Sequence, residues 1–288
     1  MIMKECCVEC LLGKKLDDYP ADASPEAVSD YRRRLRALME NGTTLSAPEA
    51  DCEMEKIYES LFGPRVDFAP IKRRFNQILL EREAEMRAGV AAAEDPLKRA
   101  IQYAMTGNFI DFAVLDSVDE AELSRLLDES ASIDVDEATL ERLKQQVRAA
   151  TKLLFMTDNC GEIVMDKVLV EALGRFNPDM RIAVMVRGEP IVNDATLEDA
   201  LQVGMDAVAH EIIGSGCGCA GNPLNRISKE ARRAIDGADV MISKGQANYE
   251  ALTGCGLNIF YIFMCKCQLF MDRFNVPRYA GMLTQEDF

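Results

Sequence analysis

The sequence predicts an α/β fold in which a parallel β-sheet is covered by helices on both faces and follows a helical domain. Three observations support this prediction. Residues 1–150 have helical periodicity and helix start and stop signals. From residue 151 onward, short apolar runs alternate with helical patterns. These runs are almost continuously apolar, as is typical of strands buried on both faces. We therefore expect a helical domain over 1–150 and an α/β domain over 151–288.

The helices of the first part are delimited by capping residues, proline and glycine. Ser24-Pro25 begins a helix that stops at Asn41-Gly42, and Ser46 begins another that stops at Gly63-Pro64. Further helices are expected over about 70–94 and 95–108, and two acidic amphipathic helices near 120–130 and 137–149.

The second part contains five predicted strands, over residues 152–157, 180–186, 206–212, 238–243 and 258–264. Helices are expected between them, over residues 163–174, 195–203 and 228–235. Because parallel strands need crossover connections, this alternation indicates a mostly parallel sheet.

Composition excludes several classes of protein. The 288 residues include 33 Lys and Arg against 48 Asp and Glu, which gives a net charge of −15. This acidity argues against binding to nucleic acids and to anionic membranes. The chain lacks a secretory leader pattern and an apolar run long enough to span a bilayer, so we expect a cytoplasmic protein. With His210 as its one histidine, it cannot form a two- or three-histidine metal site.

Polar and charged side chains follow the predicted strands. They are Asp158 and Asn159 after the first strand, Arg187 and Asp194 after the second, Lys244 after the fourth and Lys266 after the fifth. Ligands of open α/β sheets bind beyond the carboxyl ends of the strands. A lone Asp-Asn pair after a strand is usually a helix cap or a turn. Four polar strand ends on one predicted edge favour a functional site instead.

The residue types at this edge suit phosphoryl chemistry. Carboxylate and amide oxygens without imidazole favour Mg²⁺ or Mn²⁺ over zinc, and Asp158, Asn159 and Asp194 would hold such an ion. The cations Lys244, Arg187 and Lys266 would then hold an anionic group. The chain contains neither a Walker A motif nor a G-x-S-x-G motif, which argues against a P-loop ATPase and against a serine hydrolase of the nucleophile-elbow type.

Four ordered motifs carry a resemblance to a known family. They are TDNCGEIVMD at 157–166, RGEPIVND at 187–194, SKGQANYE at 243–250 and GNFID at 107–111. Together they resemble the DUF89 family, the ARMT1-like damage-control metal-dependent phosphatases, and in particular its prokaryotic branch. One departure is the loop at 215–221 (SGCGCAG), which is richer in glycine and cysteine than the family's usual loop.

The resemblance implies a three-layer α/β/α domain with a helical N-terminal domain, a divalent metal and hydrolysis of a small phosphorylated metabolite. It implies Asp158, Asn159 and Asp194 as metal ligands, and Mg²⁺, Mn²⁺, Co²⁺ or Ni²⁺ as the ion. It places Lys244 on the phosphate and brings Asn108 and Asp111 to the site from the helical side. Glu162, Arg187 and Lys266 are further candidates for substrate binding.

Two mechanisms of phosphate hydrolysis are compatible with these residues. A metal-activated water, aligned by Asp158 or Asp194, could attack phosphorus, or Asp158 could attack directly and form an aspartyl phosphate. A different function is also open: the family resemblance includes a claimed S-adenosylmethionine-dependent carboxyl methyltransferase activity. Against it, the turn after the first strand offers Asp-Asn instead of a G-x-G loop.

The cysteines support a further hypothesis. The chain has ten cysteines, and in a reducing compartment these are thiols or metal ligands more often than disulfides. If the N-terminus folds back on the last predicted strand, Cys7, Cys10, Cys265 and Cys267 could form a four-thiolate zinc or iron–sulfur site. A non-enzymatic metal-binding or redox protein is therefore the second alternative to a phosphatase. The sequence makes no prediction of oligomeric state.

Overall fold

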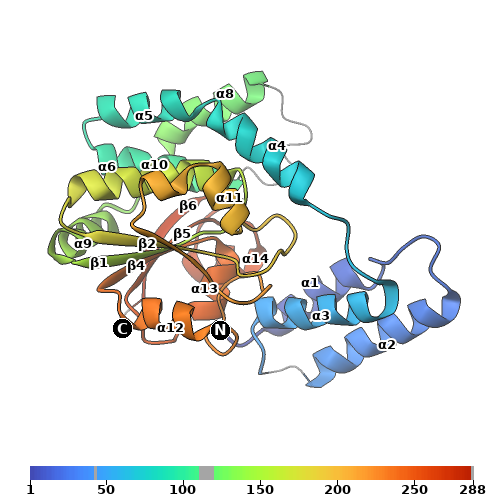
Figure 1. Cartoon of the computed structure of the whole chain (residues 1–288). Helices are drawn as coiled ribbons and strands as arrows, with labels where there is room; N and C mark the ends of the chain where they lie inside the picture. The colour runs from blue at the N-terminus through green and yellow to red at the C-terminus, as the bar shows by residue number, and fades with distance from the viewer. Residues whose placement is uncertain (42–43, 110–119, 287–288) are drawn as a thin grey trace.

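The computed structural model describes residues 1–41, 44–109 and 120–286. This part of the chain contains a β-sheet with helices around it (Figure 1). The sheet has six strands in the order β3-β2-β1-β4-β5-β6. The strands are β1 (Lys152–Met156), β2 (Arg181–Val186), β3 (Glu211–Gly214), β4 (Val240–Lys244), β5 (Ile259–Met264) and β6 (Gly281–Gln285). Neighbouring strands pair in parallel except β5 and β6, which are antiparallel. The predicted α/β fold with a mostly parallel sheet is confirmed.

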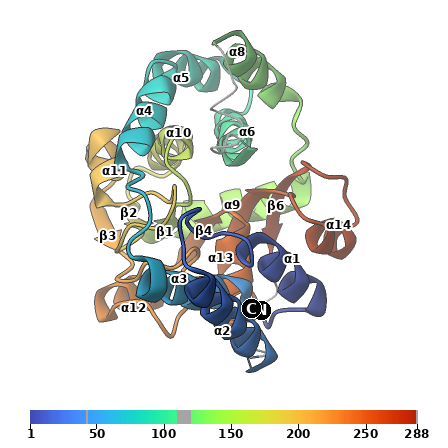
Figure 2. The same ribbon diagram turned by 90° about the vertical axis from the view of Figure 1, so that its right-hand side faces the viewer.

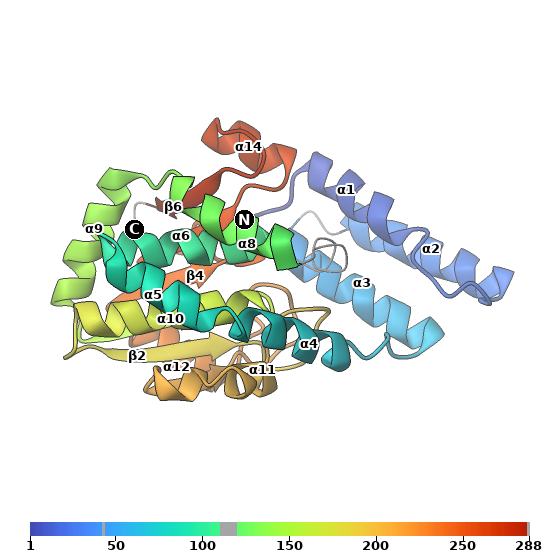
Figure 3. The same cartoon turned by 90° about the horizontal axis from the view of Figure 1, so that it is seen from above.

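One face of the sheet is covered by α4 (Ala69–Leu80), α5 (Glu83–Ala92), α6 (Pro96–Phe109), α8 (Glu120–Glu129), α9 (Glu137–Ala149), α10 (Glu162–Phe176) and α11 (Leu197–Gln202). Their apolar side chains form a single core with those of the strands. Helix α6 lies alongside α10 over the sheet (Figures 2 and 3). Gly107 allows this close approach, because a Cβ there would lie 3.0 Å from the Met165 sulfur.

The other face is covered by α12 (Lys229–Asp236), α13 (Gln246–Leu252) and α14 (Gln268–Phe274). Every residue of β4 and β5 is buried, as expected for strands covered on both sides. The Tyr249 and Phe270 rings meet edge to face with centroids 5.3 Å apart, and Phe263 packs on Phe270 in the same way. This aromatic cluster fixes α13 and α14 against the sheet.

A second core belongs to α1 (Glu5–Lys15), α2 (Pro25–Asn41) and α3 (Ala47–Phe62). Tyr31, Leu35 and Met54 are fully buried within it. These three helices project to one side of the sheet (Figure 1). The later helices of residues 1–150 share the core of the sheet instead. Residue 150 therefore marks where the strands begin, whereas the boundary between the two cores falls between α3 and α4.

Several elements differ from their predictions. The expected helix over 70–94 is two helices that change direction at Glu81 and Arg82. The bend brings both Leu79 and Met86 into the core, although neither glycine nor proline marks it. The strand expected at 206–212 begins only at Glu211, because Met205–Ala207 form a 3₁₀ turn after left-handed Gly204. The antiparallel strand β6 and the short helices α13 and α14 carry too little periodicity for sequence-based prediction.

No helix in the described ranges is long and apolar enough to cross a membrane.

Asn76 joins α4 to the start of α10. Its side chain is fully buried, and its Oδ1 accepts a hydrogen bond of 2.6 Å from the backbone N–H of Gly161. Its Nδ2 donates to Asp199 and Gln202 at 3.1 and 2.8 Å. One amide therefore supports the left-handed turn at Gly161, whose φ is +71°.

Replacing Asn76 by alanine leaves buried polar partners unsatisfied, each at a cost of about 1–3 kcal/mol. We expect Asn76→Ala to lower the free energy of unfolding by about 2 kcal/mol, measured by urea denaturation. The neighbouring exposed Gln77→Ala is the matched control and should change stability by less than about 0.5 kcal/mol. Equal effects of the two substitutions would contradict a structural role for the Asn76 amide.

Candidate active site

The polar strand ends converge between β1 and β4, where the strand order reverses. Such a topological switch point opens a crevice at the carboxyl ends of the strands. The segment after β1 and the loop after β2 pair through an antiparallel bridge between Asn159 and Asp194. Backbone hydrogen bonds of 2.8 Å join Ala195 N–H to the Asp158 carbonyl and Cys160 N–H to the Asn193 carbonyl. The three side chains predicted to hold a metal therefore lie together.

Gly245, directly after β4, allows Asp158 to occupy its position. Its φ is +80°, a conformation that favours glycine. A Cβ at Gly245 would lie only 2.0 Å from Asp158 Oδ2. The glycine of the SKGQ segment is therefore required both by backbone conformation and by the space that the carboxylate needs.

Arg187 bridges the two aspartates. Its Nε donates to Asp194 Oδ2, and its Nη2 donates to Asp158 Oδ1 at 3.3 Å. Its Nη1 donates to Asn248 Oδ1 at 3.3 Å, and the whole residue is 1 % exposed. The guanidinium thus lies between the carboxylates as a fixed positive charge, at a position that the sequence assigned to substrate binding.

Beneath these residues lies a second, fully enclosed ionic group. Lys244 Nζ donates to Glu162 Oε1 at 2.5 Å, to Asp166 Oδ1 at 2.6 Å and to the Ala104 carbonyl at 2.9 Å. Lys244 and Asp166 are 0 % exposed and Glu162 is 1 % exposed. The three protons of the ammonium are used within the protein. In this structure the lysine neutralises buried carboxylates, and its binding to a phosphate stays a prediction.

Asn108 reaches the site from the end of α6, as the resemblance implies. Its Nδ2 lies 3.1 Å from both Asp158 Oδ2 and Glu162 Oε2, and its Oδ1 accepts a 3.0 Å hydrogen bond from Met264 N–H at the end of β5. Asp111, the other predicted residue of this segment, lies outside the described residues. Lys266 is half-buried after β5, and its positive charge acts to lower the pKa of Asp158.

The centre carries more negative than positive charge. It contains the four carboxylates of Asp158, Glu162, Asp166 and Asp194, and the two cations Arg187 and Lys244 in direct contact with them. Burial raises the pKa of Asp158 to about 7, and the charges of Asp194 and Glu162 add to the shift. Burial also raises the pKa of Asp194. At Glu162 burial acts in the same direction, but the charge of Lys244 and the hydrogen bonds from Lys244, Asn159 and Asn108 together outweigh it and lower the pKa.

The predicted metal ligands are more exposed to solvent than the group formed by Lys244, Glu162 and Asp166. Asp158, Asn159 and Asp194 are 8, 9 and 6 % exposed, so they retain a narrow contact with solvent. Asn159 donates its Nδ2 to Asp158 and Glu162, at 2.9 Å each, which leaves Oδ1 as its ligand atom. Two carboxylates and one amide oxygen, in a centre with four carboxylates and two cations, match the donor set that a hard divalent cation prefers.

The structure gives no support to the four-thiolate site. Within residues 1–41, 44–109 and 120–286, no three His, Cys, Asp or Glu side chains form a group arranged to hold a metal. Cys10 is exposed and Cys7 half-buried on α1, whereas Cys265 is buried after β5 and Cys267 is half-buried beside it. Because α1 packs on α2 and α3 in the second core, its thiols are not brought to Cys265 and Cys267 as a metal site.

Two residues of the centre were not assigned a role from the sequence. Asp166 follows Glu162 by four residues, a spacing that places both on one face of α10. Asn248 Nδ2 donates to the carbonyls of Thr157 and Lys244, at 3.1 and 2.7 Å, and so ties the ends of β1 and β4 together. The i, i+4 spacing could have identified Asp166, whereas the role of Asn248 depends on tertiary contacts.

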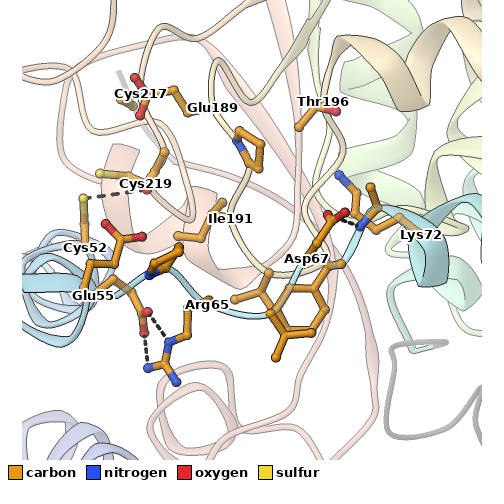
Figure 4. Close-up of a pocket in the computed structure, with 18 of the residues that line it drawn as sticks. Cys52, Glu55, Arg65, Asp67, Lys72, Glu189, Ile191, Thr196, Cys217 and Cys219 are labelled. Carbon is orange, nitrogen blue, oxygen red and sulfur yellow. Dashed lines mark hydrogen bonds and ion pairs between the residues drawn. The ribbon is translucent and has the colours of Figure 1, made fainter. Parts of the chain in front are cut away.

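A cavity of about 1060 Å³ lies beside this centre (Figure 4). Its wall includes Glu189, Ile191 and Thr196 from the loop that carries Asp194, together with Lys72 from α4 and Cys52 from α3. Among the described residues, Asp158, Asn159 and Asp194 are not part of this wall. The cavity therefore borders the loop of the site without opening directly onto its carboxylates.

Fold and site together define an α/β protein with an acidic, oxygen-rich centre at the carboxyl edge of its sheet. The profile of the damage-control phosphatase ARMT1-like domain matches residues 3–282. The chain belongs to this family of phosphatases.

Relatives and a solved structure agree with this assignment. A damage-control phosphatase of Archaeoglobus fulgidus is 30 % identical over 277 residues, which cover 93 % of each chain. A damage-control phosphatase of Pyrococcus horikoshii is 32 % identical over 192 residues, which cover 66 % of this chain and 65 % of that one. The crystal structure of a DUF89 family protein from Pyrococcus horikoshii superimposes with a TM-score of 0.84 and 22 % identity over 99 % of both chains, which shows the same fold.

Lys244 is the residue whose removal tests the enclosed ionic group. Lys244→Met leaves Glu162 and Asp166 buried without their cation, and breaking a buried pair in this way costs about 3–5 kcal/mol. We expect that loss in the free energy of unfolding, measured by urea denaturation. The exposed Lys229→Met is the control, with an expected change below about 0.5 kcal/mol. A Lys244 variant as stable as this control would mean that the lysine is not needed to neutralise the carboxylates.

Proposed function

We propose that this protein is a metal-dependent phosphomonoesterase that hydrolyses a small phosphorylated metabolite, with the metal held by Asp158, Asn159 and Asp194. The observation that carries the proposal is the clustering of four carboxylates around two cations in a buried centre, where Asp158, Asn159 and Asp194 are the most exposed of its described side chains. A buried charge excess is costly unless a counterion neutralises it. Mg²⁺, Mn²⁺, Co²⁺ and Ni²⁺ are the candidate ions.

Asp158, Asn159 and Asp194 would hold the divalent ion, which would supply positive charge to neutralise the phosphoryl oxygens. The residues of the chain prepare the site for it. The amides of Asn108 and Asn159 both bind Asp158 Oδ2, so the Asp158 carboxylate has a fixed orientation before any ligand enters. Such preorganisation lowers the reorganisation needed during reaction.

Arg187 supplies a permanent positive charge between Asp158 and Asp194. In the proposal this charge attracts the phosphoryl group and holds the two aspartates at a fixed separation. The enclosed Lys244 binds Glu162, which in turn holds the Asn159 amide. Lys244 is therefore a positioning residue in this mechanism.

The proposed substrate class is supported by the cavity that borders the loop of the site. The cavity beside the Asp194 loop is large enough for a small organic molecule. Its cations are paired, Lys72 with Asp199 at 2.6 Å and Arg65 with Glu55 at 2.7 Å. A polar metabolite with one phosphoryl group suits this mixed-charge wall better than a polyanion does.

The ligand assignment is tested with Asp158→Asn and Asp194→Asn. Each removes one negative charge without changing the size of the side chain. We expect each to lower metal-dependent kcat/KM at least about a hundredfold, since weakened metal ligation has effects of this order. Activity is measured on sugar phosphates, phosphopantetheine compounds and nucleotides, with Mn²⁺, Mg²⁺, Co²⁺ or Ni²⁺ added to protein stripped with a chelator. Calorimetric titration with Mn²⁺ alone should show weakened binding in both variants.

The exposed Asp206→Asn is the matched control and should retain full activity and metal affinity. Full activity of Asp158→Asn would overturn the ligand assignment. Methyl transfer from S-adenosylmethionine without any phosphate release would overturn the reaction class.

A further inference from the structure

Three cysteines that are far apart in the sequence meet at the wall of the cavity. Cys52 lies on α3, and Cys217 and Cys219 lie in the glycine-rich loop after β3 (Figure 4). The Cys52 thiol donates to the Gly218 carbonyl at 3.7 Å, and Gly218 stands between Cys217 and Cys219 in the loop. This contact between Cys52 and the loop joins the core of α1–α3 to the α/β part of the chain.

Positive charge and hydrogen-bond donors surround the outer two sulfurs. Arg226 Nη1 lies 3.7 Å from Cys52 Sγ, and Ser215 Oγ lies 3.9 Å from Cys217 Sγ. The neighbouring Cys219 thiol lowers the pKa of Cys217 to about 6, helped by Ser215 and the charge of Arg187. The proximity of Cys219 and the charge of Arg226 lower the pKa of Cys52 to about 7. Cys219 keeps its proton between them, and its pKa is raised.

The three cysteines differ in their exposure to solvent. Cys217 is half-buried, whereas Cys52 and Cys219 are buried at 7 and 1 % exposure. All three line the cavity, which is wide enough to admit a small oxidant. An accessible thiolate with a neighbouring thiol is the arrangement of a site of reversible oxidation.

We propose that Cys217, Cys219 and Cys52 form an oxidative modification site at which hydrogen peroxide, entering through the cavity, generates a disulfide between Cys52 and Cys219. This proposal does not depend on the phosphatase reaction, because none of the three cysteines belongs to the metal centre.

The first step takes place at Cys217. Its thiolate attacks one peroxide oxygen, the O–O bond breaks, and the departing hydroxide takes up a proton to become water, which leaves Cys217 as a sulfenic acid. Cys219 then loses its proton and attacks the Cys217 sulfur, and the hydroxyl group leaves as a second water. The peroxide has accepted two electrons, and the two thiols have become a disulfide.

The second step passes the disulfide to Cys52. The Cys52 thiolate attacks the Cys219 sulfur, and Cys217 leaves as a thiolate. A thiol of low pKa is the better leaving group in thiol–disulfide exchange, so the exchange favours release of Cys217. The product links α3 to the loop after β3.

The loop is packed tightly against the neighbourhood of Arg187. A Cβ at Gly188 would lie 2.1 Å from the backbone nitrogen of Gly216, and Gly188 N–H donates to Ser215 Oγ at 3.1 Å. A bond that pulls Cys219 toward α3 therefore acts on the segment that begins with Arg187.

The test uses the full-length reduced protein and hydrogen peroxide near stoichiometric amounts. Remaining thiols are alkylated, and the protein is digested without reduction and examined by mass spectrometry. We expect a peptide pair linked through Cys52 and Cys219, two hydrogens lighter than the separate peptides and lost after treatment with dithiothreitol. Cys217→Ser should slow formation of this link at least about tenfold, because it removes the accessible thiolate.

Two further variants keep the proposal testable. Cys219→Ser should abolish the link and leave a sulfenic acid at Cys217 that dimedone captures. The exposed Cys255→Ser is the matched control and should form the link at the wild-type rate. The proposal is overturned if Cys52 and Cys219 remain fully alkylated while the exposed cysteines oxidise, or if Cys217→Ser forms the link as fast as the wild type.

Discussion

The constraint on which the rest of this structure depends is the enclosure of four carboxylates at one point of the sheet. Carboxylates in such a place repel one another and lose hydration, so each needs a partner of opposite charge or a hydrogen-bond donor. Lys244 meets this need for Glu162 and Asp166, and Arg187 meets it for Asp158 and Asp194. The Asn108 and Asn159 amides donate to these carboxylates and are oriented by them. The orientation of Asn159 therefore depends on the buried pair of Lys244 with Glu162.

The parallel sheet explains how residues so distant in sequence reach one point. Each strand ends at the same edge, and the reversal of strand order between β1 and β4 leaves space for side chains there. The helix α6 adds a contribution from outside the sheet. Its last turn places Asn108 against both Asp158 and the end of β5, so the helical layer helps to build the site as well as to cover it.

Much of this arrangement could be predicted from the sequence, because apolar runs and polar strand ends are local patterns. They located four of the five parallel strands and the edge at which Asp158, Asn159 and Asp194 lie together, whereas the third strand was expected at 206–212 and is Glu211–Gly214. The depth of Lys244 could not be predicted, since burial depends on which helix covers a strand end, and here Glu162 and Asp166 of α10 reach the ammonium first. The bend near Glu81 was also missed, because tertiary packing of Leu79 and Met86 causes it without glycine or proline. The thiol cluster joins Cys52 to a loop that follows it by more than a hundred and fifty residues, a contact that no spacing rule indicates.

The separate core of α1–α3 has a consequence for how the molecule unfolds. This unit meets the rest of the chain through α13 and through polar pairs such as Glu53 with Arg226 at 2.6 Å and Glu49 with Asn225 at 2.8 Å. Segments with their own apolar interior and mainly polar attachments open as cooperative units below the global free energy of unfolding. The amides of α1–α3 are therefore expected to exchange with solvent deuterium as a group, while those of β1, β4 and α10 remain protected.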